Sequence, residues 1–173
     1  MKILKIAAGI LLILILAFLA VGLFSPEFAY ENSVTIDRPP EQVWKVFTDQ
    51  DRMGDWLEGL ERVENLGGQP LQVGSRWKLV FLQDGEQVEV IEQVTAVKPD
   101  EFYAFDIETD PFAGNVEIRF EPLPPGQTLL TATTTVNGRT LLWRSVLRLS
   151  KGMLADQSQK SYEKLKQLAE SGS

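Results

Sequence analysis

The sequence predicts an α+β fold, in which a curved antiparallel β-sheet wraps around a long C-terminal α-helix and an N-terminal transmembrane helix precedes the domain. Three observations support this prediction. An uncharged apolar run opens the chain, strand-like alternation of apolar residues dominates its middle, and a helix-like apolar stripe occupies its C-terminal part. An antiparallel sheet with one apolar face needs a covering element, and the C-terminal helix supplies one. A chain of 173 residues has room for one domain beside the N-terminal segment.

Residues 1–25 are predicted to be a transmembrane signal anchor, and residues 26–173 a single domain. Ile6–Phe24 holds no charged residue, and at ~1.5 Å per helical residue it is long enough for the ~30 Å hydrocarbon layer. Lys2 and Lys5 precede it, which predicts a cytoplasmic N-terminus and an extracytoplasmic domain, in the periplasm or its equivalent. A cleaved signal peptide is the alternative, although its apolar region usually has only ~7–15 residues. A buried helix of a soluble protein is disfavoured, because every face of the segment is apolar.

The predicted domain begins with a strand and two short helices. Phe28–Asp37 alternates apolar and polar residues, as a half-buried strand does. Pro39 and Pro40 end this strand, and proline is favoured in the first turn of a helix. Glu41–Thr48 and Asp51–Leu60 each carry apolar residues at helical spacing, so each predicts a short helix.

A run of about six strands is expected next, joined by short connections as an antiparallel meander. Alternating or β-branched residues mark five of them, in the stretches Trp77–Leu82, Val88–Ala96, Tyr103–Ile107, Val116–Phe120 and Thr128–Val136.

One helix is predicted over Arg139–Glu170. Gly152 lies within it and indicates either a bend or close contact, or a glycine that the helix simply tolerates. The helix is basic whereas the rest of the domain is acidic, which favours a solvated face; contact with anionic lipid headgroups is the alternative. Its predicted core-facing stripe consists of Leu142, Val146, Leu149, Met153, Leu154, Ser158, Ser161, Leu165 and Leu168.

This order of elements resembles the SRPBCC superfamily, also called START-like or Bet v 1-like, with its helix-grip fold. The motifs that carry the resemblance are Val34–Trp44, Phe47–Asp49, Met53–Trp56, Val73–Trp77 and Glu92–Pro99. The polyketide cyclase/dehydrase-like and coenzyme Q-binding-like branch is the most similar. The superfamily includes lipid carriers, cyclases, hormone receptors and co-chaperones, so the resemblance implies a fold and does not settle a function. The membrane segment is an addition to the family pattern.

The composition excludes several classes of function. The chain has no histidine and no cysteine, so Ser-His-Asp triads, thiolate nucleophiles and His- or Cys-ligated metals are excluded. A net charge of -7 argues against nucleic acid as a partner. Asp106 and Glu108 alternate with Phe105 and Ile107, which favours a solvated sheet face over a metal site. We therefore expect no metal and no cofactor.

Glu92 is the most informative single residue. It shares the inward parity of Val88, Val90 and Val94, and a carboxylate on an apolar face is costly unless it is paired, hydrogen-bonded or protonated. The functional interpretation is a polar group in the cavity that anchors a ligand or acts as an acid or base. The alternative is a structural pair with an arginine or a tyrosine hydroxyl, or a bulge that turns Glu92 to solvent.

Other candidates share the predicted inward direction. Asn32 is a second possible ligand contact, with a structural role as its alternative, and Trp56 lies in the short helices at the predicted entrance. The aromatic candidates are either cavity lining or plain core. Small Ser158 and Ser161 leave space opposite the sheet unless Tyr162 fills it. The complete set of predicted ligand-binding residues is Asn32, Trp56, Trp77, Phe81, Glu92, Phe105, Phe120, Ser158, Ser161 and Tyr162.

The leading hypothesis for function is a membrane-tethered, non-enzymatic module that binds an apolar small molecule, such as a lipid, a quinone or a polyketide-like compound, between the sheet and the C-terminal helix. The tether is expected to bring the cavity mouth near a supply of lipid. One alternative is an envelope interaction or structural protein with a filled cavity. Another is a cyclase or dehydratase that uses Glu92 as a general acid or base without metal.

Overall fold

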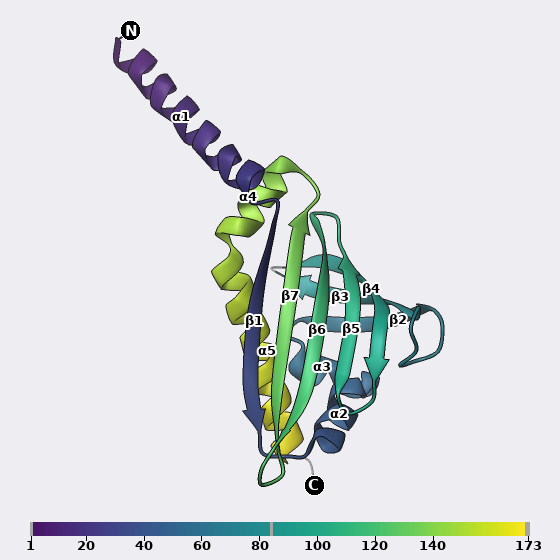
Figure 1. Ribbon diagram of the computed structural model, residues 1–173. Helices are drawn as coiled ribbons and strands as arrows, with labels where there is room; N and C mark the ends of the chain where they lie inside the picture. The colour runs from purple at the N-terminus through teal and green to yellow at the C-terminus, as the bar shows by residue number, and fades with distance from the viewer. Residues whose placement is uncertain (1, 84, 172–173) are drawn as a thin grey trace.

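The computed structural model describes residues 2–83 and 85–171. An N-terminal helix, α1 (Lys2–Phe24), projects from one end of a body made of a sheet and helices (Figure 1). The sheet has seven strands in the order β1-β7-β6-β5-β4-β3-β2, and every neighbouring pair is antiparallel. The strands are β1 (Glu27–Ile36), β2 (Leu60–Gly67), β3 (Arg76–Gln83), β4 (Glu86–Lys98), β5 (Phe102–Glu108), β6 (Phe112–Leu123) and β7 (Gln127–Gly138).

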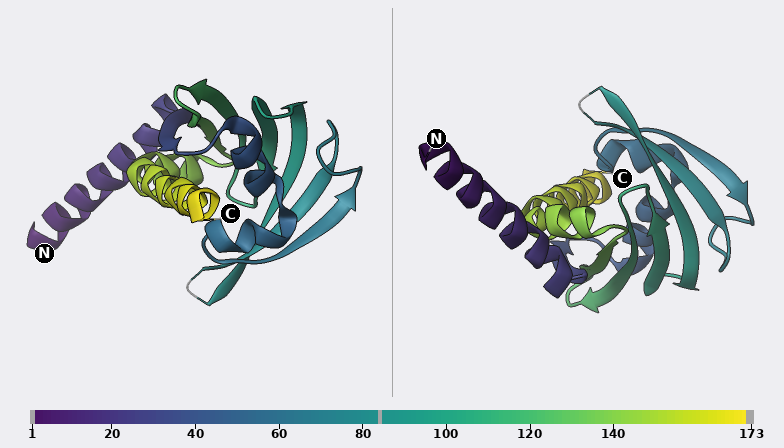
Figure 2. Two further views of the ribbon diagram at one scale, coloured as in Figure 1. Left: turned by 90° about the horizontal axis from the view of Figure 1, so that it is seen from below. Right: turned by 90° about the horizontal axis from the view of Figure 1, so that it is seen from above.

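The sheet curves around the C-terminal helix α5 (Lys151–Ser171), which both end-on views of Figure 2 show. The predicted α+β helix-grip architecture is therefore confirmed. Inward-facing residues of the sheet, the short helices and α5 form the main core, because alternate residues of each strand point to the same face. Its most deeply buried members are Ile36, Val43, Val94, Ile118, Phe120, Leu130, Ala132 and Leu165.

The first elements of the domain follow their apolar periodicity, with one correction. In β1 the buried and exposed residues alternate, and α2 (Pro40–Thr48) buries the apolar face that its spacing predicts. The second predicted helix is shorter than Asp51–Leu60, because it consists of a 3₁₀ turn, η1 (Gln50–Arg52), and α3 (Met53–Trp56). The helical path ends at Leu57, which is extended with a φ of −83° and a ψ of 103°, and Gly59 then takes a φ of +80° close to the Leu82 carbonyl.

Three register shifts, two in β2 and one in β4, break the strict alternation of side chains. β2 was not among the strands that alternation marked, and its register against β3 shifts twice along its length. In β4 the register shifts between Val94 and Ala96. After this bulge Val97, rather than the predicted Ala96, packs against the core. A bulge inserts one residue, so every side chain beyond it changes face.

The predicted single helix over Arg139–Glu170 is two helices. α4 (Leu141–Leu149) ends at Ser150, and α5 begins at Lys151. The side chain of Thr140 caps α4 by accepting a hydrogen bond from the Trp143 N–H at 3.2 Å. Gly152 lies inside α5, and a Cβ added there would contact nothing within 4 Å, so this glycine is simply tolerated.

Only the second half of the predicted apolar stripe faces the sheet. In α5, Ser161 and Leu165 are buried as predicted. In α4, by contrast, the opposite face is buried, since Leu147 packs on Phe28 and Val136 in a second, smaller core. The members of the stripe at this end lie outward: Leu142, Leu149 and Met153 are 55%, 65% and 72% exposed.

α1 is long and apolar enough to cross a membrane, and its side chains are exposed along most of its length. It is therefore not a buried helix of the domain. Its last turns pack against α4, where the Gly22 N–H donates a hydrogen bond to Ser145 Oγ at 3.0 Å. A Cβ on Gly22 would lie 2.5 Å from this Oγ and 2.6 Å from the Leu141 carbonyl oxygen, so glycine permits the close approach of the two helices.

Gly114→Ala is expected to lower the free energy of unfolding by about 1–3 kcal/mol, the usual effect of overpacking. Gly114 lies in β6 where a Cβ would overlap the Thr135 carbonyl oxygen of the neighbouring strand. Urea denaturation followed by tryptophan fluorescence measures the change. Gly152→Ala is the control, because its site is open and alanine favours helix, so this variant should be at least as stable as the parent. Equal stability of the two variants would contradict the close approach at Gly114.

Candidate functional site

A cavity of about 330 Å³ lies between the sheet and α5. This volume is at the lower end of the range for small-molecule sites, which are mostly apolar with a few polar groups. Aromatic and aliphatic side chains of β3 to β6 form most of the wall, and α5 closes the other side with Ser158, Ser161 and Tyr162. The apolar sheet residues in the wall include Trp77, Leu79, Phe81, Val90, Phe105, Ile107, Val116 and Ile118.

The mouth of the cavity lies between the short helices and the loop that joins β2 to β3. Gln50, Pro70 and Leu71 line the cavity and are exposed, while Met53 and Trp56 of α3 contribute to the adjoining wall. The short helices form the entrance, as the sequence predicts. However, α2 and α3 lie toward the end of the domain that is far from α1 (Figure 1). The mouth therefore lies away from the end of the domain that carries α1.

Glu92 and Tyr103 form a buried polar pair within the apolar wall. Glu92 lies on β4 opposite Trp77 of β3 and Ile107 of β5, which fixes its inward direction. The Tyr103 hydroxyl donates a hydrogen bond to Glu92 Oε1 at 3.1 Å, and only 8% of Glu92 is exposed. The Tyr103 ring packs against Phe105 with 5.6 Å between ring centroids. The inward direction is the one that the parity of Glu92 predicts, and a tyrosine hydroxyl is one of the partners expected for a structural pair.

Burial raises the pKa of Glu92 to about 7, and the hydrogen bond from Tyr103 offsets part of this rise. Burial and the adjacent carboxylate also raise the pKa of Tyr103 above its usual value, so the phenol stays protonated. Near neutral pH Glu92 therefore exists in both protonation states. A protonated carboxyl can donate a hydrogen bond to a ligand carbonyl, and an ionised one can accept a proton.

Eight of the ten predicted ligand-binding residues line the cavity: Trp56, Trp77, Phe81, Glu92, Phe105, Ser158, Ser161 and Tyr162. Phe120 is instead packed in the core beside Trp44, and is 1% exposed. Asn32 also lies outside the lining. Its Nδ2 donates hydrogen bonds to the Ala155 carbonyl at 3.0 Å and to Gln159 Oε1 at 3.1 Å, so it joins β1 to α5.

Some polar atoms of the residues that line the cavity have hydrogen-bond partners within the fold, and one does not. The Ser158 hydroxyl hydrogen-bonds to the Tyr30 hydroxyl at 3.2 Å, and Ser161 Oγ donates to the Gln157 carbonyl at 3.3 Å. The Trp56 ring stacks on Tyr162 with 6.5 Å between centroids. Trp56 Nε1 is buried and has no hydrogen-bond partner among the described residues. Burying such a donor without a partner is costly.

Tyr103 and Tyr30 are functional candidates that the sequence analysis did not select. Tyr103 shares the parity of Phe105 in its strand, and Tyr30 that of Asn32 in β1, so the periodic signal was present for both. What the sequence lacks is the pairing of each hydroxyl across the fold. Among residues 2–83 and 85–171, no group of three or more acidic side chains is arranged to hold a metal ion.

Tyr103→Phe is expected to raise the pKa of Glu92 further above 7, because the hydrogen bond from Tyr103 lowers it. The pKa is measured by following the side-chain carboxyl carbons of glutamate by NMR during a pH titration. Tyr30→Phe, which alters a different hydroxyl of the same cavity, serves as the control and should leave the value unchanged. An unaltered pKa in Tyr103→Phe would show that the hydrogen bond does not reach the carboxylate in solution.

Comparisons with known proteins agree with this geometry. The model of a family described as "Polyketide cyclase / dehydrase and lipid transport" matches residues 27–170. No curated protein matches the chain.

Solved structures share the fold at low sequence identity. A protein from Thermus thermophilus is 21% identical, with a TM-score of 0.67 over 85% of this chain and 100% of that one. An aromatase/cyclase from a Streptomyces species is 18% identical, with a TM-score of 0.63 over 82% and 96%. A START superfamily protein from Mycobacterium smegmatis is 18% identical, with a TM-score of 0.65 over 81% and 98%. At these identities the likeness concerns the fold alone.

Proposed function

The chain belongs to the polyketide cyclase / dehydrase and lipid transport family, and from this premise we propose that it is a membrane-tethered, non-enzymatic module that binds an apolar small molecule. Its family is one of hydrophobic ligand-binding and polyketide cyclase-like domains. The observation that carries the proposal is the apolar cavity of about 330 Å³ between the sheet and α5. An interior of this volume offers little support for the alternative of a structural protein with a filled cavity.

The cavity suits a ligand with an apolar body and one polar group. Most of the wall excludes charged ligands, since a charge is costly to bury without a partner. Glu92 and Tyr103 together offer a hydrogen-bond donor and acceptor on one side. A carbonyl or hydroxyl oxygen on an otherwise apolar molecule would satisfy these groups. Lipids, quinones and polyketide-like compounds all meet this description.

The proposed tether is α1, crossing the bilayer with its N-terminus in the cytoplasm and the domain on the other side. Lys2 and Lys5 at the N-terminal flank support this orientation. Because the cavity mouth lies far from α1, the ligand enters from the aqueous side rather than laterally from the bilayer. A C-terminal alkaline phosphatase fusion, active only after export, tests the orientation; an inactive fusion beside an active cytoplasmic reporter would contradict it.

Native mass spectrometry of the full chain, released from detergent micelles, tests the binding function. The expected result is a population carrying an additional mass of one small apolar molecule, which organic extraction recovers and identifies. A Val116→Trp variant, which places a bulky ring in the cavity wall, should lose this mass. Repeated recovery of the parent without a bound molecule, after purification from several hosts and detergents, would contradict the proposal.

Acid–base catalysis is the second candidate, and one observation favours it. A carboxyl with a pKa of about 7 is well placed to exchange a proton near neutral pH, and Glu92 has such a pKa inside the cavity. Tyr103 would orient the carboxyl and stay protonated. In this case the protein would act as a cyclase or dehydratase. Turnover of the recovered ligand that persists unchanged in Glu92→Gln would exclude this role for Glu92.

A further inference from the structure

We propose that α4 is an interfacial membrane helix: its outward apolar stripe inserts among the lipid headgroups beside α1, and its arginines contact anionic headgroups. This inference rests on the proposed membrane crossing of α1 and goes beyond it, because it assigns a second membrane contact and fixes the orientation of the domain. The stripe is defined as Leu142, Val146 and Leu149 of α4 together with Met153 in the first turn of α5, which recur in the sequence at intervals of four, three and four residues. Val146 is half-buried, and the other three are exposed.

The first support is that this face is apolar and uncovered. Leu142, Leu149 and Met153 are more than half exposed, and Trp143 at the N-terminal end of α4 is 39% exposed. Leucine side chains at these positions contribute nothing to the core, since α4 is held to the domain by Leu147 on its other face. Contiguous apolar surface of this kind marks a contact with a membrane or a partner.

The second support is the position at which α4 contacts α1, which lies close to the C-terminal end of the predicted membrane-spanning segment. Gly22 contacts Leu141 and Ser145 of α4, and it lies only two residues, ~3 Å along the helix axis, before the end of the apolar run at Phe24. If Ile6–Phe24 fills the hydrocarbon layer, α4 must lie at its boundary, in the headgroup region. Leu23 and Phe24, which follow Gly22, are also apolar and exposed, at 64% and 82%. The position of α4 at the end of the apolar run therefore selects the bilayer as the occupant.

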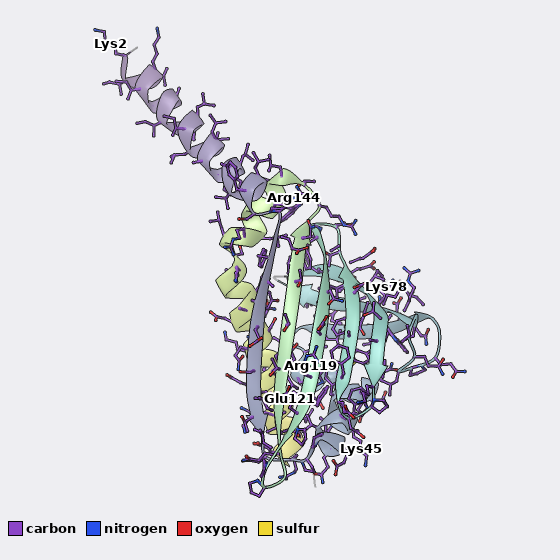
Figure 3. The ribbon with its side chains drawn as sticks, viewed as in Figure 1. Lys2, Lys45, Lys78, Arg119, Glu121 and Arg144 are labelled. Carbon is purple, nitrogen blue, oxygen red and sulfur yellow. The ribbon has the colours of Figure 1, made fainter. Side chains whose placement is uncertain are left out.

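The third support is the charge of the segment. Arg139–Lys151 contains four basic residues and no acidic one, within a chain whose net charge is -7. Figure 3 shows Arg144 where α1 meets the domain, and Lys2 at the opposite end of α1. Arg144 donates a hydrogen bond from Nε to the Gly138 carbonyl, and the Arg148 guanidinium lies over the Phe28 ring as a cation–π contact. Each guanidinium has five N–H donors, so donors remain for a headgroup. Basic flanks and tryptophan are typical of helices that lie in the interface of anionic membranes.

The consequence concerns the orientation of the cavity. The close fit of Gly22 against Ser145 joins α1 to α4, so a membrane contact at α4 fixes how the domain stands on the bilayer. α5 then runs away from the membrane, and the short helices at the cavity mouth face the aqueous phase (Figures 1 and 2).

Fluorescence quenching by brominated lipids tests this arrangement in the full chain. Because the chain has no native cysteine, Leu149→Cys and Val73→Cys each carry a single environment-sensitive label. Both positions are exposed and apolar in the parent, at 65% and 67%, but Val73 lies in the loop near the cavity mouth. The variants are reconstituted into vesicles of phosphatidylcholine, with and without phosphatidylglycerol, that contain acyl-brominated lipid. The label at position 149 is expected to be quenched at least about twofold more than the label at position 73, and more strongly when phosphatidylglycerol is present.

Flotation of the same vesicles shows whether a negative result overturns the membrane contact of α4 or the membrane anchor α1. If the protein floats with the vesicles but positions 149 and 73 are quenched equally, the interfacial role of α4 is overturned while the anchor stands. If the protein does not float, the anchor is overturned and the inference fails with it. Shielding of position 149 from aqueous iodide without lipid quenching would show that a second copy covers the stripe, which also overturns the proposal. Met153→Cys gives an independent position on the stripe, and quenching that is equal with and without phosphatidylglycerol would overturn the headgroup contact.

Discussion

Glu92→Gln is expected to raise the free energy of unfolding by about 3 kcal/mol at pH 8 and to leave it almost unchanged near pH 4. Glutamine keeps the shape of the side chain and accepts the Tyr103 hydrogen bond, but it carries no charge at any pH. The parent, in contrast, must bury a carboxylate once the pH exceeds the pKa of Glu92 in the folded protein, which is about 7.

The direction of the pH dependence follows from the two pKa values. Below pH 4.5, the ordinary pKa of a glutamate, Glu92 is protonated in both the folded and the unfolded chain, so it makes no difference. Between pH 4.5 and about 7 the unfolded chain releases the proton while the folded protein retains it, and the stability of the parent falls as the pH rises. Above pH 7 both states are ionised and the full loss of about 3 kcal/mol remains.

Urea denaturation of the full chain in detergent, between pH 4 and pH 8, measures this effect. Glu121→Gln is the matched control, because Glu121 is exposed on the outer side of β6 (Figure 3) and its replacement should change the stability by less than about 0.5 kcal/mol. If the curves for the parent and Glu92→Gln run parallel over this range, the carboxyl is solvated and the buried pair with Tyr103 does not exist in solution.

The double replacement Ser158→Leu with Ser161→Leu is expected to weaken binding of an apolar molecule in the cavity by at least about tenfold, or about 1.4 kcal/mol. Both serines line the cavity from α5, and the longer side chains would occupy space that the ligand needs. The loss of the hydrogen bond between Ser158 and Tyr30 is offset by the burial of additional carbon atoms. The stability should therefore change by no more than about 1 kcal/mol.

The neutral fluorescent probe N-phenyl-1-naphthylamine reports occupancy in this experiment, and its affinity is compared between the parent and the variant. Gln167→Leu adds a leucine to the exposed side of α5 and should leave the affinity unchanged. A loss of several kcal/mol in stability from the double replacement would instead indicate that α5 and the sheet pack at native density, without a usable cavity.

Much of the architecture was predictable from the sequence, because it depends on local periodicity. Alternation of apolar and polar residues identified β1 and placed Glu92 on the apolar face of its strand. The pair Pro39 and Pro40, followed by apolar residues at helical spacing, located α2. The motifs from Val34 to Pro99 predicted the family. These signals are reliable because the direction of a side chain along a regular strand or helix is set by its position alone.

Three features were decided only by the tertiary structure. The bulges in β2 and β4 change the face of the residues that follow them, so Val97 replaces Ala96 in the core. The hydroxyl that meets Glu92 belongs to another strand, and the choice of Tyr103 depends on the register between β4 and β5. The break at Ser150 lets α4 turn its apolar stripe outward beside α1.

The physical reason is the same in each case. The sequence determined which residues are apolar and which share one face of an element, and with that the fold class and the inward position of Glu92. It did not determine what each face meets, because that depends on contacts between residues far apart in the chain. Gly22 and Ser145 are 123 residues apart, and their contact places α4 at the end of α1. Only the folded chain brings these two helices together, and so only the tertiary structure shows that the apolar stripe of α4 is left uncovered.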